Sequence, residues 1–200
     1  SNAMKRLVLL LASVVLYGAD TVPVFAADYD NQGTTGQSVA QPVVAADKAL
    51  TRLIAGNNRF VNDQSRVPEE NESLRKVLAE EQKPFATVLG CSDSRVIPEI
   101  IFDEGLGDLF VIRVAGNVVD QSVTASIEYG VEHLDTRLVV VLGHDNCGAV
   151  TTALAPPHDE PRELNSLVNA IHNRIYANWE FDDDADKHME IGVAVRKNVM

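Results

Sequence analysis

Two short runs of this chain contain the residue types best suited to chemistry. The first, 91–95, reads Cys-Ser-Asp-Ser-Arg, and the second, 144–148, reads His-Asp-Asn-Cys-Gly. The chain has two cysteines, and both lie in these runs. Two thiolates and an imidazole supply three of the four ligands that zinc prefers, so Cys91, His144 and Cys147 form a candidate zinc site. Its fourth position is open, as is typical of a catalytic zinc.

Asp93 and Arg95 are spaced to control that fourth position. Zinc lowers the pKa of a bound water from about 15.7 to about 7 and so supplies hydroxide near neutral pH. The Arg95 guanidinium can fork onto the Asp93 carboxylate, which keeps Asp93 ionised and away from the metal. Asp93 is then free to accept a hydrogen bond from the O–H of zinc-bound hydroxide and orient it towards a substrate. If the pair breaks, Asp93 can become the fourth ligand and close the site.

A disulfide between Cys91 and Cys147 is the simplest alternative to zinc. Two cysteines in an exported protein are often paired, and sequence spacing does not exclude such a bond. The presence of Asp93, Arg95 and His144 beside the cysteines favours zinc.

The segments around the two runs predict an α/β fold. Short apolar runs typical of strands buried on both faces occur at 85–90, 109–115 and 138–143. A helical pattern at 122–134 separates the last two, and this alternation predicts a mostly parallel central sheet flanked by helices. Ligands bind beyond the carboxyl ends of such strands. Cys91 and His144 each follow a strand directly, so we expect both at the same edge of the sheet.

Four further helices are expected outside the strand region. Two form an N-terminal helical arm, and two lie near the C-terminus: 45–62, 69–82, 163–179 and 186–200. Gly56 weakens the middle of the first helix. The last helix runs to Met200 without a cap or a breaker, so we expect the C-terminal part of the domain to be truncated.

The N-terminus has the features of a secretory signal. Lys5 and Arg6 precede an apolar run, 7–16, that is too short to span a bilayer comfortably, and Ala26 ends a small-residue cleavage pattern. An apolar helix that stays attached is the alternative. We expect this organisation: a tag remnant at 1–3, a signal peptide at 4–27, a flexible leader at 28–44 and an α/β domain at 45–200. The mature protein would be periplasmic or secreted.

The composition fits a single folded domain that acts on a small molecule. The 200 residues are 46% hydrophobic, which is enough to build a core. The formal net charge of -12 argues against binding to nucleic acid or to an anionic membrane surface. Beyond the apolar run at 7–16, no long apolar run suggests a membrane segment of the mature form.

The two motifs together resemble those of the β-class carbonic anhydrases, and the resemblance covers about 45–200. The combination is far more specific than either motif alone. The resemblance implies reversible hydration of carbon dioxide to bicarbonate and a proton. It also implies one Zn²⁺ per subunit on Cys91, His144 and Cys147, with Asp93 and Arg95 as the catalytic dyad. Family members usually continue past the position of Met200 with a further strand and closing helical elements.

Three more positions resemble the plant-like subgroup of that family. Gln82 falls where the subgroup has a substrate-binding glutamine, and Phe110 and Tyr129 fall at its aromatic pocket positions. The family builds this pocket at a dimer interface, so the resemblance implies a homodimer or higher homo-oligomer in which these residues serve the neighbouring subunit's zinc. It also favours the open site over the closed one. The plain alternatives are a solvated Gln82, a core Phe110 and an ordinary packed Tyr129.

Two other functions remain open from the sequence. A related zinc hydrolase could act on CS2 or COS through the same nucleophile. A non-catalytic zinc-binding module of the same fold is the second, but its expected mark is a lost dyad, and Asp93 and Arg95 are both present. The other four histidines have no metal-ligand spacing with one another, so we interpret them as surface or hydrogen-bonded residues.

Overall fold

The part of the chain that the computed structural model describes consists of six segments: 13–16, 43–66, 70–155, 160–177, 194–195 and 198–199. Outside it lie the expected tag remnant, nearly all of the expected signal peptide and leader, and all but four residues of the helix expected at 186–200.

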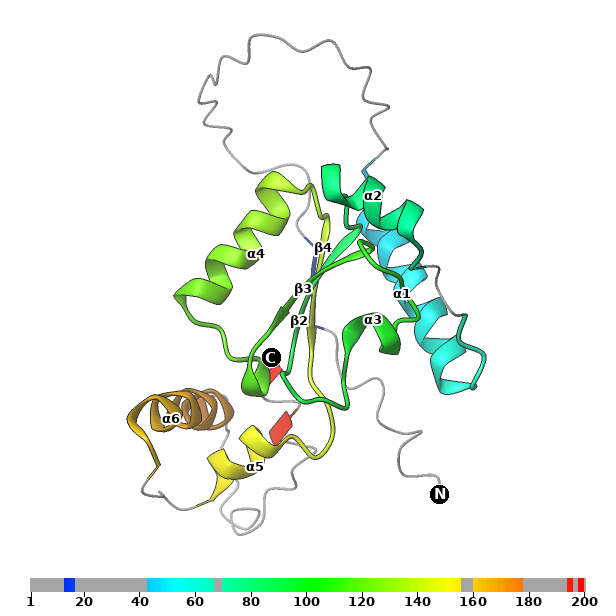
Figure 1. Cartoon of the computed structure of the whole chain (residues 1–200). Coiled ribbons are helices and arrows are strands. Elements are labelled where there is room, and N and C mark those ends of the chain that lie inside the picture. Colours follow the sequence, from blue (N-terminus) through cyan, green and yellow to red (C-terminus); the bar gives the residue numbers. More distant parts are fainter. Residues whose placement is uncertain are drawn as a thin grey trace, which may run out of the picture.

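A four-stranded sheet with the order β1-β4-β2-β3 forms the centre of the molecule (Figure 1). Its three parallel strands are β2 (Ala86–Gly90), β3 (Leu109–Arg113) and β4 (Leu138–Leu142). Every residue of the central strand β2 is buried. This burial explains the uninterrupted apolar run in the sequence, because a strand covered on both faces has no solvent side to alternate with. The predicted mostly parallel α/β sheet is confirmed.

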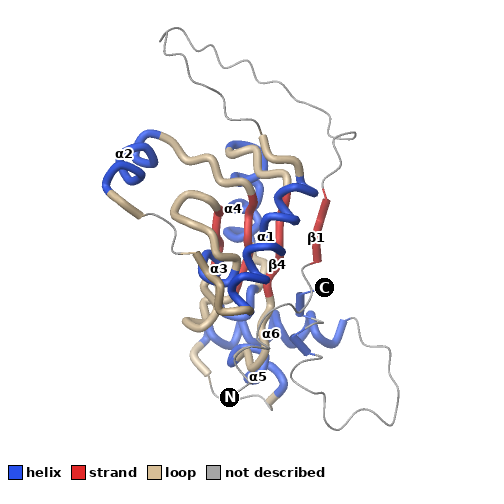
Figure 2. The backbone as a smooth tube through the Cα atoms, turned by 90° about the vertical axis from the view of Figure 1, so that its right-hand side faces the viewer, coloured by secondary structure: helices blue, strands red, loops and turns tan. Residues whose placement is uncertain are grey.

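The sheet edge beside β4 is occupied by β1 (Ser13–Leu16), which runs antiparallel to it (Figure 2). Ser13 lies opposite Val141, and Leu16 lies opposite Leu138. These four residues belong to the apolar run assigned from the sequence to a signal peptide, and that assignment stays a prediction. Apolar residues suit both the core of a signal sequence and an edge strand. Cleavage of such a signal would remove this partner of β4.

Helices cover both faces of the sheet (Figure 1). On one face α4 (Gln121–His133) packs against β2 and β3, and it begins where the Asp120 side chain accepts a hydrogen bond from the Val123 N–H at 2.8 Å. On the other face lie α1 (Ala46–Val61) and the short α3 (Pro98–Ile101). The expected N-terminal helical arm is therefore present.

Helix α1 approaches the main chain after α3 very closely. A Cβ atom at Gly56 would lie 1.7 Å from the Phe102 carbonyl oxygen, so only glycine permits this approach. The Asn57 side-chain amide donates to the Ile101 carbonyl at 3.1 Å. Gly56 therefore weakens the isolated helix but permits it to dock on the domain.

Two buried carboxylates reinforce this docking. The side chains of Asp103 and Glu104 are each 1% exposed, and they pair with Arg59 and Arg52 of α1. Arg66, just beyond α1, also reaches Asp103 at 3.3 Å. Buried carboxylates that carry such partners hold the arm in place, since loss of the cation would leave a charge unpaired.

The remaining helices lie near the two ends of the parallel strands. Helix α2 (Glu72–Glu80) is shorter than the expected 69–82 and has no buried residue. Helices α5 (Gly148–Leu154) and α6 (Arg162–Ala177) pack together near the carboxyl ends of the strands (Figure 1). The sequence did not predict α3, α5 or the 3-10 turn Ala115–Asn117, because each is too short to show a helical period.

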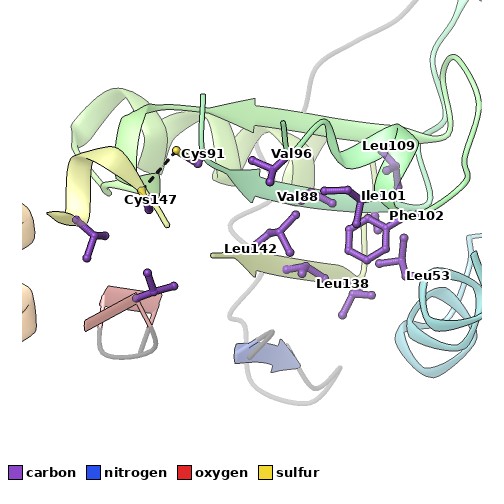
Figure 3. Close-up of a cluster of buried hydrophobic side chains, with 14 of the residues drawn as sticks. Leu53, Val88, Cys91, Val96, Ile101, Phe102, Leu109, Leu138, Leu142 and Cys147 are labelled. Carbon is purple, nitrogen blue, oxygen red and sulfur yellow. Dashed lines mark hydrogen bonds between the residues drawn. The ribbon is translucent and has the colours of Figure 1, made fainter. Parts of the chain in front are cut away.

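The hydrophobic core lies between the sheet and its helices, and the two cysteines form one end of it (Figure 3). Val88 and Val140 of adjacent strands are almost fully buried, and Leu53 of α1 packs in the same cluster. Among the described residues, no helix combines the length and the apolar character needed to cross a membrane.

Candidate metal centre

The structure brings the three predicted ligands together at the carboxyl edge of the sheet. Cys91 directly follows β2, His144 follows β4 after one glycine, and Cys147 is the residue that precedes α5. Their ligand atoms all lie within 4.8 Å of one another, and all three residues are buried. The two Sγ atoms are 4.0 Å apart, and both cysteines are free thiols (Figure 3). The structure therefore has no disulfide between Cys91 and Cys147.

Tight backbone turns set the directions of the cysteine side chains. Gly116 has φ 65° and donates its N–H to the Cys91 Sγ at 3.3 Å. Asn146, with φ 56°, makes the turn between His144 and Cys147. Both turns use the left-handed region, which glycine and asparagine enter more readily than other residues.

The two thiols strongly affect each other's ionisation. The Cys147 thiol hydrogen-bonds to Cys91 and so lowers the pKa of Cys91, despite the opposing effect of burial. The same contact, together with burial, raises the pKa of the Cys147 thiol. Two thiolates this close repel each other, so a cation between them is needed for both to stay ionised. The thiol pair is therefore suited to a metal ion.

His144 presents one ring nitrogen to the same point. Its Nδ1 lies 3.0 Å from the Asp145 carbonyl oxygen, which fixes the proton on Nδ1, while the buried Nε2 has no hydrogen-bond partner. Burial lowers the pKa of His144, but the direct interaction of its ring with the Cys91 sulfur, together with the negative charges of Cys91 and Asp93, outweighs burial and raises that pKa overall. A buried imidazole lone pair beside two thiols is the donor set that zinc prefers, so these residues fit Zn²⁺.

Asp93 and Arg95 form the predicted pair. Arg95 donates to the Asp93 carboxylate from its main-chain N–H (3.0 Å), from Nε (2.8 Å) and from Nη2 (2.7 Å). This pairing holds the pKa of Asp93 well below its usual value. Arg95 also donates to the Asn146 carbonyl at 3.1 Å and so joins the two motifs. The Asp93 Oδ2 lies 3.9 Å from the His144 Nε2, so the carboxylate borders the ligand cluster while Arg95 holds it.

Arg113 also belongs to this site, and sequence reasoning missed it. Its Nε donates to the Cys91 carbonyl at 2.9 Å and its Nη2 to the Asp93 carbonyl at 2.7 Å. The available signal was its place near the end of the second predicted strand, at the edge where Cys91 was expected. Contacts to carbonyl oxygens leave no mark in the sequence, so this role could not be assigned there.

The three predicted pocket residues do not gather at this chain's own ligand cluster. Phe110 of β3 and Tyr129 of α4 contact each other, with ring centroids 6.0 Å apart. The exposed Gln82 precedes β2 and lines a cavity of about 300 Å³ together with Phe85 and His133. Phe110 and Gln82 thus lie towards the amino ends of the strands, whereas the ligand cluster follows the carboxyl ends.

Known proteins share both the sequence and the fold. The sequence model of one protein family, described as "Carbonic anhydrase", matches residues 86–200. "Carbonic anhydrase 2" of Mycobacterium tuberculosis is 54% identical over 116 residues, which are 58% of this chain and 55% of that protein. "Carbonic anhydrase" of Mycolicibacterium smegmatis is 53% identical over 132 residues, 66% of this chain and 62% of that protein. The chain therefore spans little more than half the length of these relatives.

Among solved structures, a tetrameric β-carbonic anhydrase of Sordaria macrospora matches with a TM-score of 0.56 and 28% identity. The match covers 74% of each chain. The family match extends over more than half of the chain and includes the ligand cluster. From these matches and the shared fold we conclude that the chain belongs to the β-carbonic anhydrase family.

Proposed function

We propose that this protein is a zinc-dependent carbonic anhydrase that interconverts carbon dioxide and bicarbonate with release of a proton. The observation that carries the proposal is the cluster of two thiols and an unpartnered imidazole nitrogen. Arg95 holds the Asp93 carboxylate beside this cluster, with its Oδ2 3.9 Å from the His144 Nε2. When bound, Zn²⁺ supplies the positive charge that makes water a nucleophile near neutral pH.

The chain's own residues would orient the reaction. Asp93 stays ionised because Arg95 donates to both of its oxygens, so it can accept a hydrogen bond and fix the direction of a neighbouring O–H group. The Arg95 bond to the Asn146 carbonyl fixes the position of the Asp93 carboxylate relative to the second motif. This arrangement supports the open form of the site rather than the form closed by Asp93.

The decisive test is a stopped-flow assay of carbon dioxide hydration by the zinc-loaded protein. We expect rapid turnover that depends on pH between about pH 7 and about pH 9. If the protein binds one zinc per subunit but does not exceed the buffer rate, a non-catalytic zinc-binding module is the better description.

We further infer that the substrate pocket, of the plant-like kind, is completed by a second subunit. Gln82, Phe110 and Tyr129 lie away from the chain's own ligand cluster, so a role for them in a substrate pocket requires the metal site of a neighbouring subunit. In the described part of the chain β3 pairs on one side only, and Phe110, Val111 and Ile112 are half-buried along it. Such an edge suits pairing with another copy. The β-carbonic anhydrases of Sordaria macrospora are tetrameric.

A complementation experiment tests this shared pocket. Asp93→Ala removes the dyad, and Phe110→Ala removes the proposed pocket contact, so each variant alone should have little activity. In a mixed dimer, one of the two sites carries neither change, so mixing the subunits should restore part of the activity. No recovery, with subunit exchange shown by mass spectrometry, would place the pocket within one chain.

We also propose that the protein is exported to the periplasm or beyond the cell. The support is the basic, apolar and small-residue pattern within 4–27. Expression of the whole chain followed by N-terminal sequencing of the product tests it, and we expect cleavage after Ala26 or Ala27. An uncleaved product retained in the cytoplasm would refute export.

A further inference from the structure

Arg113 ties the segment that carries Cys91 and Asp93 to a rigid strand. It is the last residue of β3 and lies opposite Gly90 in the parallel register of β2 and β3. Its guanidinium donates to the carbonyl oxygens of Cys91 (2.9 Å) and Asp93 (2.7 Å). The main chain supports the same alignment, because the Val114 N–H donates to the Gly90 carbonyl at 3.1 Å.

These bonds act on main-chain conformation rather than on an opposite charge. No carboxylate in the described part of the chain forms an ion pair with Arg113. A guanidinium has a rigid fork of donors, so it can hold two carbonyl oxygens at a fixed separation. A strand end that donates such a fork restrains the loop it contacts.

Two different arginines thus hold the side-chain carboxylate and the main-chain carbonyl of Asp93. Arg95 binds its carboxylate, while Arg113 and the Val96 N–H (3.1 Å) bind its carbonyl oxygen. The carboxylate is close to the ligand cluster, with Oδ2 3.9 Å from the His144 Nε2. To enter the cluster, the carboxylate must leave Arg95. A rotation of the turn towards the cluster would also draw the Asp93 carbonyl away from Arg113.

We propose that Arg113 is a positioning residue that keeps Asp93 out of the metal's coordination shell and thereby keeps the site open to external ligands. The inference rests on the zinc site proposed above. Without Arg113, the segment depends on Arg95, whose side chain is 53% exposed, and on two main-chain bonds, from the Val96 N–H to the Asp93 carbonyl and from the Ser92 N–H to the Val114 carbonyl. Asp93 then competes with any external ligand, and the apparent affinity for that ligand falls in proportion to the open fraction.

Azide binding to the Co²⁺-loaded protein measures this open fraction without turnover. Visible spectroscopy reports both the cobalt–thiolate bonds and the arrival of azide. For Arg113→Met we expect full cobalt loading and about tenfold weaker azide binding, the effect of losing the charge-assisted hydrogen bond to the Asp93 carbonyl. Arg137→Met is the matched control, because Arg137 is exposed and pairs with Asp135 at the opposite end of β4. It should bind azide like the wild type.

A second background separates position from charge, since Arg113→Met also removes a positive charge that attracts azide. In Asp93→Ala the competing carboxylate is gone, so adding Arg113→Met should change azide affinity less than about twofold. An equal loss in both backgrounds would show that Arg113 acts through its charge and would overturn the proposal.

Arg113→Lys keeps the charge but cannot hold two carbonyl oxygens with one planar fork. We expect it to show most of the loss seen with methionine, and wild-type azide affinity in this variant would refute the inference. If Arg113→Met fails to load cobalt, Arg113→Lys in the two backgrounds decides the question. A wild-type protein that binds cobalt and azide but does not hydrate carbon dioxide would refute the proposed function and leave this inference standing.

Discussion

Replacing Gly116 with alanine should damage the metal centre although it changes no ligand. Gly116 has φ 65° and donates its N–H to the Cys91 Sγ at 3.3 Å. An L-residue pays about 1–2 kcal/mol in this left-handed conformation. The new Cβ would also lie 2.5 Å from the Ile171 Cδ1 and 3.2 Å from the Ala149 Cβ.

The crowding adds to the backbone strain. Ile171 is fully buried in α6, so its side chain cannot turn into solvent, and overpacking of this kind costs about 1–3 kcal/mol. Together the two effects should lower the free energy of unfolding by about 2–5 kcal/mol. If the 116 peptide rotates to relieve them, the bond to Cys91 is lost, and the loss of such an outer contact weakens metal binding by about 10–100-fold.

Urea denaturation of the zinc-free protein measures the first quantity, and zinc competition against a chelator measures the second. Gly148→Ala is the matched control, because it adds the same methyl group beside the other cysteine, where a Cβ meets no atom within 4 Å. It should leave the free energy of unfolding unchanged or raise it slightly.

A second substitution separates crowding from strain. Ile171→Val removes the Cδ1 atom and alone costs about 0.5–1.5 kcal/mol. In the Gly116→Ala background it should instead recover stability, while the left-handed strain remains. Wild-type stability and zinc affinity in Gly116→Ala would refute this reasoning, and full additivity of the two changes would refute the crowding part of it.

Three further predictions concern the dyad, the arm and the metal. Asp93→Ala should retain zinc by metal analysis but lose most carbon dioxide hydration in stopped flow; an unchanged rate would contradict the dyad. Burial opposes ionisation of Asp103, but the hydrogen bonds from Arg59 and Arg66 outweigh burial and lower the pKa of this carboxyl group. The ionised Asp103 therefore stabilises the fold above about pH 4, and this stabilisation disappears as the pH falls through the folded-state pKa. Asp103→Asn should therefore lower the free energy of unfolding by about 1–3 kcal/mol at neutral pH. In urea titrations the difference from the wild type should shrink below about pH 4, and a difference that stays constant with pH would contradict the pairing. Removing zinc should lower the melting temperature. It should also let a mild oxidant form a disulfide between Cys91 and Cys147, whose sulfurs are 4.0 Å apart, and titration of free thiols with and without zinc measures this disulfide.

The sequence predicted the parallel sheet because buried strands must be continuously apolar. The run at 138–143 and the strand β4 differ by a single residue at the C-terminal end. The same reasoning placed Cys91 and His144 at one edge, since parallel strands end on the same side. Elements shorter than two helical turns, such as α3 and α5, were missed because they carry no period.

The role of Gly56 depends on a contact with a distant segment. Gly56 reads as a weak point of a helix, yet the structure shows that a Cβ there would overlap the Phe102 carbonyl. A close approach between segments far apart in the chain has no local signature. The edge strand β1 was likewise not expected, because its apolar residues are equally typical of a signal sequence.

The sequence by itself determined the chemical identity of the centre: which side chains can bind zinc, and which carboxylate and guanidinium lie beside them. Motif spacing carries that information because these groups are held by short turns that follow strands. Only the tertiary structure decided that the Nε2 of His144 is the unpartnered nitrogen, that Arg113 holds the turn of Asp93, and that Gln82 and Phe110 lie away from their own chain's metal site. These outcomes depend on strand register and main-chain contacts across the sheet, which no local pattern of residues encodes.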